Sequence, residues 1–255
     1  MDERLVAFQR LLDIMDDLRE KCPWDRKQTI SSLRTHTIEE TYELVDAIIA
    51  NDMESLKGEI GDLMLHMVFY SKIASETGAF DITDVLNGIC EKLITRHPHI
   101  YGDVEVKDEE DVKRNWEKIK LKEGNKSVLG GVPRSLPAMV KAIRIQEKVK
   151  GVGFDWETTE QVIEKVNEEW SELQQEVKER SDKIEDEFGD VLFSLINYAR
   201  FINIDPETAL EKTNKKFINR FQYMENTIRE NNQSLSELNL TEMDKYWKQA
   251  KESER

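Results

Sequence analysis

Residues 39–62 read EETYELVDAIIANDMESLKGEIGD, and residues 168–190 read EEWSELQQEVKERSDKIEDEFGD. Each stretch holds a Glu-Glu-x-x-Glu motif, then a helical pattern, then a Glu-x-x-Asp motif. Positions three or four apart share one face of a helix, so each motif presents a pair of carboxylates to one side. Two such helices packed antiparallel would enclose a cage of oxygen atoms. The carboxylates of the two expected cages are Glu40, Glu43, Glu59 and Asp62, and Glu169, Glu172, Glu187 and Asp190.

A carboxylate cluster without sulfur or imidazole ligands suits Mg²⁺, Mn²⁺ or Ca²⁺ better than zinc or copper. The alternative is an ordinary solvated face, which is what most Glu-rich helices present to water. Here both Glu-x-x-Asp motifs run directly into apolar segments, residues 63–70 and 191–196, which are typical of buried helices. Buried carboxylates are costly without a counter-charge, so the pattern favours a cation. A glycine inside each motif, Gly61 and Gly189, indicates a close approach of backbone or ligand.

The duplication extends over most of the chain. Trp24-Asp25 corresponds to Phe154-Asp155 and Trp116 to Trp247, with offsets that drift as loop insertions would make them drift. Helical periodicity dominates, and no pair of alternating strands is convincing. We therefore predict an all-α fold of tandem duplicated helical-bundle domains. The expected boundaries are a first domain over residues 1–123, a Gly- and Pro-containing linker over 124–137, and a second domain over 138–255.

Composition excludes several partners. The net charge of −15 would repel a nucleic-acid backbone, and no basic stripe compensates for it. No apolar run is long enough to span a bilayer, and the first residues do not form a secretory signal, so we expect a cytoplasmic protein. A polyphosphate substrate would need local cations. Lys216 and Arg220 stand four residues apart on one helix face and could clamp phosphate oxygens, or could be ordinary surface charge.

Several motifs in order resemble the MazG family of nucleoside triphosphate pyrophosphohydrolases over nearly the full length. Besides the acidic motifs, they are CPWDRKQT at 22–29, RHPH at 96–99, VLGGVP at 128–133 and GFDW at 153–156. The resemblance implies tandem all-α domains, a homodimer, and Mg²⁺, for which Mn²⁺ could substitute. It also implies an enzyme that cleaves nucleoside triphosphates between the α and β phosphates, releasing a monophosphate and pyrophosphate, with broad base specificity.

Carried over by position, the resemblance makes the C-terminal copy the main active site. It implies metal ligands at Glu169, Glu172, Glu187 and Asp190, and substrate contacts at Lys165, Glu168, Lys183, Lys216, Arg220 and Trp247. Among these, the residues expected to act in catalysis are Glu168, Glu169, Glu172, Lys216 and Arg220, with Glu168 the suggested general base. Trp247 would offer its ring to a base with little selectivity.

The N-terminal copy departs from the family pattern at one position. Its counterpart of Lys183 is Ser55 or a near neighbour, although Lys57 could substitute. Its acidic set, Glu40, Glu43, Glu59 and Asp62, is intact, so a second metal site is possible there. Whether this copy is active remains open at the level of sequence.

Two rival interpretations come from other classes of protein. A di-iron bundle would need Glu-x-x-His motifs, and the second copy contains no histidine. A non-catalytic dimerisation or regulatory module would keep the duplicated bundle without turnover, and a pyrophosphate-release assay separates it from the enzyme. Within the enzyme class, hydrolysis of damaged nucleotides competes with broad hydrolysis of ordinary ones, and nothing in the residues decides the base preference.

Overall fold

The computed structural model describes residues 2–109, 111–112, 115–116, 119 and 127–253. They form two compact units, Met1–Trp116 and Glu117–Arg255, each built from helices. No strand occurs in these described ranges, and both units repeat the same acidic hairpin, so the predicted all-α tandem fold is confirmed. The predicted linker over 124–137 overlaps the start of the second unit. Its residues 124–126 lie outside the described residues, and Val128–Gly131 form the 3₁₀ helix η2.

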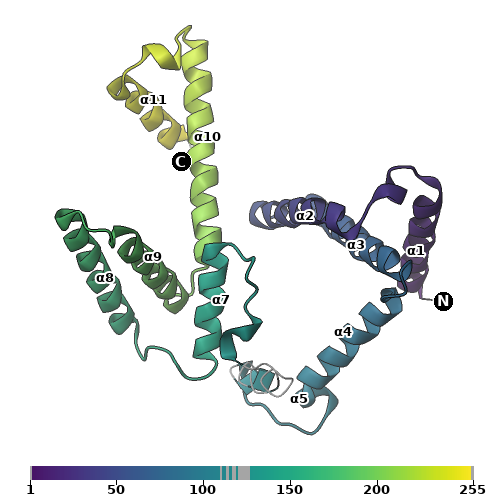
Figure 1. The fold of residues 1–255 in the computed structure, drawn as a ribbon. Helices are drawn as coiled ribbons and strands as arrows, with labels where there is room; N and C mark the ends of the chain where they lie inside the picture. Colours follow the sequence, from purple (N-terminus) through teal and green to yellow (C-terminus); the bar gives the residue numbers. More distant parts are fainter. Residues whose placement is uncertain (1, 110, 113–114, 117–118, 120–126, 254–255) are drawn as a thin grey trace. The chain divides into compact units, whose positions relative to one another are not determined.

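The N-terminal unit is centred on a helical hairpin (Figure 1). Its helices are α1 (Glu3–Lys21), α2 (Ile30–Ala50), α3 (Met53–Ser75), α4 (Ile82–Arg96) and α5 (Pro98–Tyr101), with the 3₁₀ helix η1 (Asp25–Lys27) after α1. Helices α2 and α3 pack along each other, and α1 packs against α3. Where the three meet, Met15, Leu33, Val68 and Phe69 form a core in which each side chain is at most 3% exposed.

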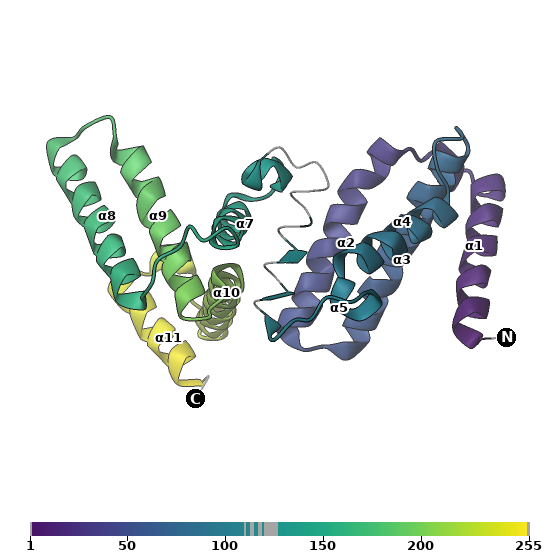
Figure 2. The same ribbon diagram turned by 90° about the horizontal axis from the view of Figure 1, so that it is seen from below.

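The C-terminal unit repeats the hairpin and adds a second one (Figure 2). Its helices are α7 (Ala138–Lys150), α8 (Thr159–Glu179), α9 (Ile184–Phe201), α10 (Pro206–Glu230) and α11 (Leu240–Ser253), with the 3₁₀ helix η3 (Leu235–Glu237) between the last two. Helix α8 packs along α9, and α10 packs along α11. Helix α7 packs against α9, where buried Gln146 donates from Nε2 to the Phe193 carbonyl at 2.9 Å.

The two acidic hairpins begin and end in the same way. Thr29 caps α2 and Thr158 caps α8, and each completes a reciprocal capping box with the residue three positions on. At the other end, Asn51 and Arg180 both adopt the left-handed conformation, with φ of 55° and 54°. That conformation satisfies the last helix carbonyls and turns the chain into the next helix. The first helix of each hairpin therefore begins and ends in the same way.

Each unit ties the segment before its hairpin with a guanidinium. In the C-terminal unit, Arg200 of α9 pairs with Asp155, and the Nη1–Oδ2 distance is 2.8 Å. In the N-terminal unit, the guanidinium comes from α1 instead. Arg19 donates to the carbonyls of Asp25 and Gln28 and forms two hydrogen bonds to the Glu76 carboxylate. A guanidinium thus holds the loop before each hairpin in place. It comes from α9 in the C-terminal unit and from α1 in the N-terminal unit.

Many large apolar side chains of the two hairpins are exposed in the single chain. Met64 and Met67 of α3 are 45% and 46% exposed, and Leu192, Phe193 and Leu195 of α9 are exposed to a similar degree. Within the single chain, the expected burial of these segments therefore holds only in part, at residues such as Val68, Phe69, Val191 and Ile196. No helix in the part of the chain that the structure describes carries an apolar run that would reach across a bilayer.

Candidate active site

Three carboxylates from two helices meet in the C-terminal unit. Glu169 of α8 and Glu187 and Asp190 of α9 each place an oxygen within 4.8 Å of the others. Glu187 and Asp190 are three residues apart on α9, so one helix face presents both to the facing helix. The trio consists of oxygen donors alone, which is the donor set that Mg²⁺ and Mn²⁺ prefer. The predicted cage is present for these three residues.

Glu172, the fourth predicted ligand, lies one turn further along α8 and is exposed. It is not part of the closest trio, but its charge is near enough to act on Glu187. Burial raises the pKa of the Glu187 carboxyl, and repulsion from Glu172, Asp190 and Glu169 raises it further. A raised carboxyl pKa means that the negative form is disfavoured where it stands. A divalent cation would relieve this repulsion, so the electrostatics of the cage fit a metal ion.

A lysine on the same helix neutralises part of this charge. Lys165 Nζ lies 2.9 Å from Glu168, three residues along α8, and 2.7 Å from Glu169, four residues along. The two hydrogen bonds raise the pKa of Lys165, the bond to Glu169 most. Glu169 is 8% exposed, so this ion pair fixes the one ligand that is buried. Lys165 thus stands at the edge of the cage.

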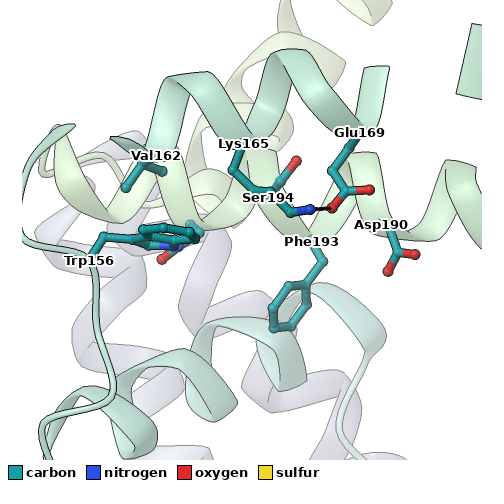
Figure 3. A pocket seen from close by; sticks show the side chains of 8 residues that line it. Trp156, Val162, Lys165, Glu169, Asp190, Phe193 and Ser194 are labelled. Atoms are coloured by element: carbon teal, nitrogen blue, oxygen red, sulfur yellow. Dashed lines mark ion pairs between the residues drawn. The ribbon is translucent and has the colours of Figure 1, made fainter. Parts of the chain in front are cut away.

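A cavity of about 160 Å³ opens beside the cage (Figure 3). Glu169 and Asp190 form one side of it, next to Lys165. The remaining wall comes from the loop before α8 and from the two helices, and it consists of Trp156, Val162, Phe193, Ser194 and Asn197. An aromatic ring, aliphatic surface and a few polar groups near charged residues are typical of a small-molecule site. None of these five wall residues is predicted from the sequence, because a loop and two helices contribute to the wall together.

The N-terminal unit holds a similar trio. Glu40 of α2, its neighbour Glu43 one turn on, and Glu59 of α3 place oxygens within 4.8 Å of one another. Burial raises the pKa of Glu40, and the charges of Asp62 and Glu43 add to the effect. Burial also raises the pKa of Glu59, followed by repulsion from Glu43 and Glu40. Asp62 lies outside the closest trio, but its charge acts on Glu40. The second metal site in this unit stays a prediction.

The other predicted substrate residues lie elsewhere in the C-terminal unit. Lys216 and Arg220 are on α10, and Trp247 is on α11, where its ring packs against Phe217 with centroids 5.0 Å apart. This second hairpin contacts α9 and α7 through α10, whereas the carboxylates lie on α8 and α9. Lys183 is the exposed residue that precedes α9. Within a single chain, the structure therefore brings Lys165, Glu168 and the cage together and leaves Lys216, Arg220 and Trp247 in a separate hairpin.

The glycines of the two Glu-x-x-Asp motifs are not required by packing within the chain. At Gly61 and Gly189, no protein atom lies within 4 Å of the position that a Cβ would occupy. The expected close approach is therefore wrong for the backbone of the described residues, and a close approach of a ligand stays a prediction. Neither glycine adopts a positive φ, so both are ordinary helical residues with open space beside them.

Comparisons with known proteins agree on one family. The MazG nucleotide pyrophosphohydrolase domain matches residues 28–101 and again residues 157–224. A Thermotoga maritima protein named nucleoside triphosphate pyrophosphohydrolase/pyrophosphatase MazG is 44% identical over 98% of both chains. An Escherichia coli (strain K12) protein named nucleoside triphosphate pyrophosphohydrolase is 40% identical over 97% of this chain and 98% of its own. The uncharacterized protein YabN of Bacillus subtilis is 46% identical over this whole chain, which spans 54% of it.

Proposed function

The chain belongs to the MazG family of nucleotide pyrophosphohydrolases, and we propose that it hydrolyses nucleoside triphosphates between the α and β phosphates. The products are a nucleoside monophosphate and pyrophosphate, and the base specificity is broad. The observation that carries this proposal is the trio Glu169, Glu187 and Asp190, whose mutual repulsion a cation would relieve and which borders a cavity of about 160 Å³. The similarity over almost the whole chain to relatives named nucleoside triphosphate pyrophosphohydrolase supports the reaction class.

Mg²⁺ is the proposed cofactor, with Mn²⁺ as a substitute. Glu169, Glu187 and Asp190 would hold it, and Glu172 is close enough in charge to join them. When bound, such an ion lowers the pKa of a coordinated water and neutralises charge on phosphate oxygens. The donor set consists of carboxylates only, which excludes a site built for soft metals.

The remaining steps fall to side chains of this chain. Water attacks the α phosphorus, the bond from that phosphorus to the bridging oxygen breaks, and the bridging oxygen leaves with pyrophosphate. Glu168 is the proposed base for the water proton, because it is exposed beside the cage and its carboxylate is held by Lys165. Lys216 and Arg220 are the proposed clamp on the leaving pyrophosphate, and Trp247 is a further proposed substrate contact.

A homodimer is the proposed assembly. Large apolar side chains of α3, α9 and α10 are exposed within the chain, among them Met64, Leu192 and Phe217. A second copy would cover such a surface, since cyclic dimers are the commonest protein assemblies. Nucleic acid is not a proposed partner, because the net charge of −15 opposes it. The proposed compartment is the cytoplasm, where nucleoside triphosphates are made and used.

The proposal is tested by product analysis. Purified protein is incubated with each of the common and damaged nucleoside triphosphates, with Mg²⁺ and with a chelator. We expect monophosphate and pyrophosphate in equal amounts, only with the metal, and for several bases. Release of diphosphate and inorganic phosphate would contradict the cleavage position, and turnover of damaged nucleotides alone would contradict the broad specificity.

The N-terminal trio provides a separate prediction. The double change Glu40→Gln and Glu43→Gln is expected to leave at least about half of the triphosphate hydrolysis, because the C-terminal copy matches the family's site residues at more positions. Steady-state rates at saturating Mg²⁺ measure the effect, and size-exclusion chromatography controls for assembly. Loss of nearly all activity with the assembly intact would assign the main active site to the N-terminal unit.

A further inference from the structure

The cavity beside the C-terminal cage can be compared position by position with the same place in the N-terminal hairpin. The equivalent caps and turns place Leu33 at the position of Val162 on the first helix of each hairpin, and both side chains are 1% exposed. On the second helix, Val68 corresponds to Ile196, and both are buried. The two hairpins therefore share their core positions, and differences between them lie in the residues around that core.

Two of the cavity positions carry much larger side chains in the N-terminal unit. His66 stands where the C-terminal unit has Ser194, and Phe69 stands where it has Asn197. His66 is 8% exposed, and its Nδ1 is buried without a hydrogen-bond partner. Phe69 is 2% exposed and belongs to the core with Met15 and Leu33. At these two positions the N-terminal unit therefore carries a buried imidazole and a buried phenyl ring, where the C-terminal unit has a hydroxyl and an amide.

The guanidinium anchors fit this difference. In the C-terminal unit, Arg200 donates to Oδ1 of Asn197 at 2.7 Å while it also holds Asp155. This fixes the amide with its oxygen engaged and its NH₂ group as the remaining donor. In the N-terminal unit, Arg19 lies over the Phe69 ring, 5.8 Å from its centroid. One hairpin is thus built around a polar wall residue and the other around a packed ring.

We propose that the cavity beside the C-terminal cage receives the nucleoside portion of the substrate, and that Ser194 and Asn197 keep it open. In the N-terminal unit, His66 and Phe69 close the same place, so its acidic trio can hold a cation but no nucleoside. The difference in nucleoside binding between the two copies then depends on the residues at these two positions, because both copies keep their carboxylates. This inference rests on the proposed function, because it assigns the part of the triphosphate that lies beyond the phosphates.

The test transfers the N-terminal residues into the C-terminal unit. In the double variant Ser194→His and Asn197→Phe, the added side chains would fill the cavity and exclude the nucleoside, so kcat/KM for nucleoside triphosphates should fall about ten- to a hundredfold. Inorganic tripolyphosphate has no nucleoside. It should inhibit wild type and variant with the same inhibition constant, because it needs only the cage and the basic residues. The Mn²⁺ stoichiometry, measured by electron paramagnetic resonance, should also be unchanged.

A matched control adds the same side chain outside the cavity. Ser171 of α8 is exposed, and its hydroxyl donates to the Asn167 carbonyl at 2.8 Å, as the Ser194 hydroxyl donates to the Val191 carbonyl at 2.9 Å. Ser171→His should therefore keep the wild-type kcat/KM. The single change Ser194→His provides a milder variant should the double one unfold, with a smaller loss in the same direction.

Three results would overturn the inference. Unchanged kcat/KM in a folded double variant would show that the nucleoside binds elsewhere. An equal loss of tripolyphosphate inhibition would show that the cavity holds phosphates, and an equal loss in Ser171→His would show a general effect of histidine on the helices. The proposed function fails differently, because absence of Mg²⁺-dependent pyrophosphate release from wild type does not involve the cavity residues.

Discussion

Asp190→Asn is expected to lower Mg²⁺-dependent kcat/KM about a thousandfold while leaving the helical fold intact. The change keeps the shape of the side chain and removes one of the three charges that meet in the C-terminal cage. A metal contributes several kcal/mol of charge stabilisation to the transition state, which by transition-state theory corresponds to about three orders of magnitude. Glu172→Gln should also lose turnover, although the exposed Glu172 lies outside the closest trio.

Asp190→Asn should not lower the stability of the metal-free protein, although it lowers activity. The charge of Asp190 is one of the causes that raise the pKa of Glu187. Removing that charge relieves repulsion, so the melting temperature without metal should stay equal or rise, while the gain on adding Mg²⁺ should shrink. Circular dichroism melts with and without Mg²⁺ measure both quantities.

Glu185→Gln is the matched control for this prediction. Glu185 is exposed in the first turn of the same helix and is not a member of the trio, so its removal changes the net charge of α9 equally. Near-normal activity is expected for this control. A folded Asp190→Asn variant that kept most of its rate at saturating Mg²⁺ would remove Asp190 from the metal site.

Arg220→Ala is expected to lower kcat/KM about a hundredfold, or about 2.7 kcal/mol, with a substantial part in kcat. Arg220 is proposed to meet the pyrophosphate as negative charge develops on it, and only contacts that strengthen in the transition state speed the reaction. Lys216→Ala should show a milder loss, because an ammonium acts as a point charge where a guanidinium can hold two oxygens. An increase in KM alone, for every base tested, would make Arg220 a uniform binding contact.

The position of Arg220 allows a sharper experiment. Arg220 lies on α10, in a hairpin separate from the one that carries the cage, so a second copy could supply it to the site. Mixing inactive Asp190→Asn chains with Arg220→Ala chains would then rebuild one complete site in each mixed dimer. With random pairing, about a quarter of the wild-type activity should return, as two-fold symmetry requires. If each chain supplies its own Arg220, mixing restores nothing.

The carboxylate cage is the part of the site that sequence predicts best. Glu187 and Asp190 meet because a three-residue spacing on a helix is enough to align them, and Glu169 follows once the hairpin is recognised. The ion pair of Lys165 with Glu168 and Glu169 follows the same rule, because its spacing of three and four residues is visible in the sequence. Local periodicity is sufficient wherever one or two helices decide the geometry.

The cavity and the burial of the hairpins could not be predicted in this way. The cavity joins Trp156, from a loop, to Phe193 and Asn197 of α9, and its width depends on how two helices and a loop pack. The apolar segments of α3 and α9 indicate burial, yet Met64 and Leu192 are about half exposed. A hydrophobic pattern predicts that a surface is apolar, but it does not predict whether the same chain or another protein covers that surface.

The two guanidinium anchors have a consequence for how such a duplicated gene can diverge. In one copy, the guanidinium comes from Arg19 on the helix before the hairpin, and in the other from Arg200 within the hairpin itself. A recombination event that exchanged only the hairpins would leave one copy with two guanidinium groups at this place and the other with none. The smallest segment that can be exchanged intact is therefore the hairpin together with the helix and loop before it, three helices in all. Point substitutions at Phe69 or Asn197 are restricted for the same reason, because each depends on the anchor of its own copy.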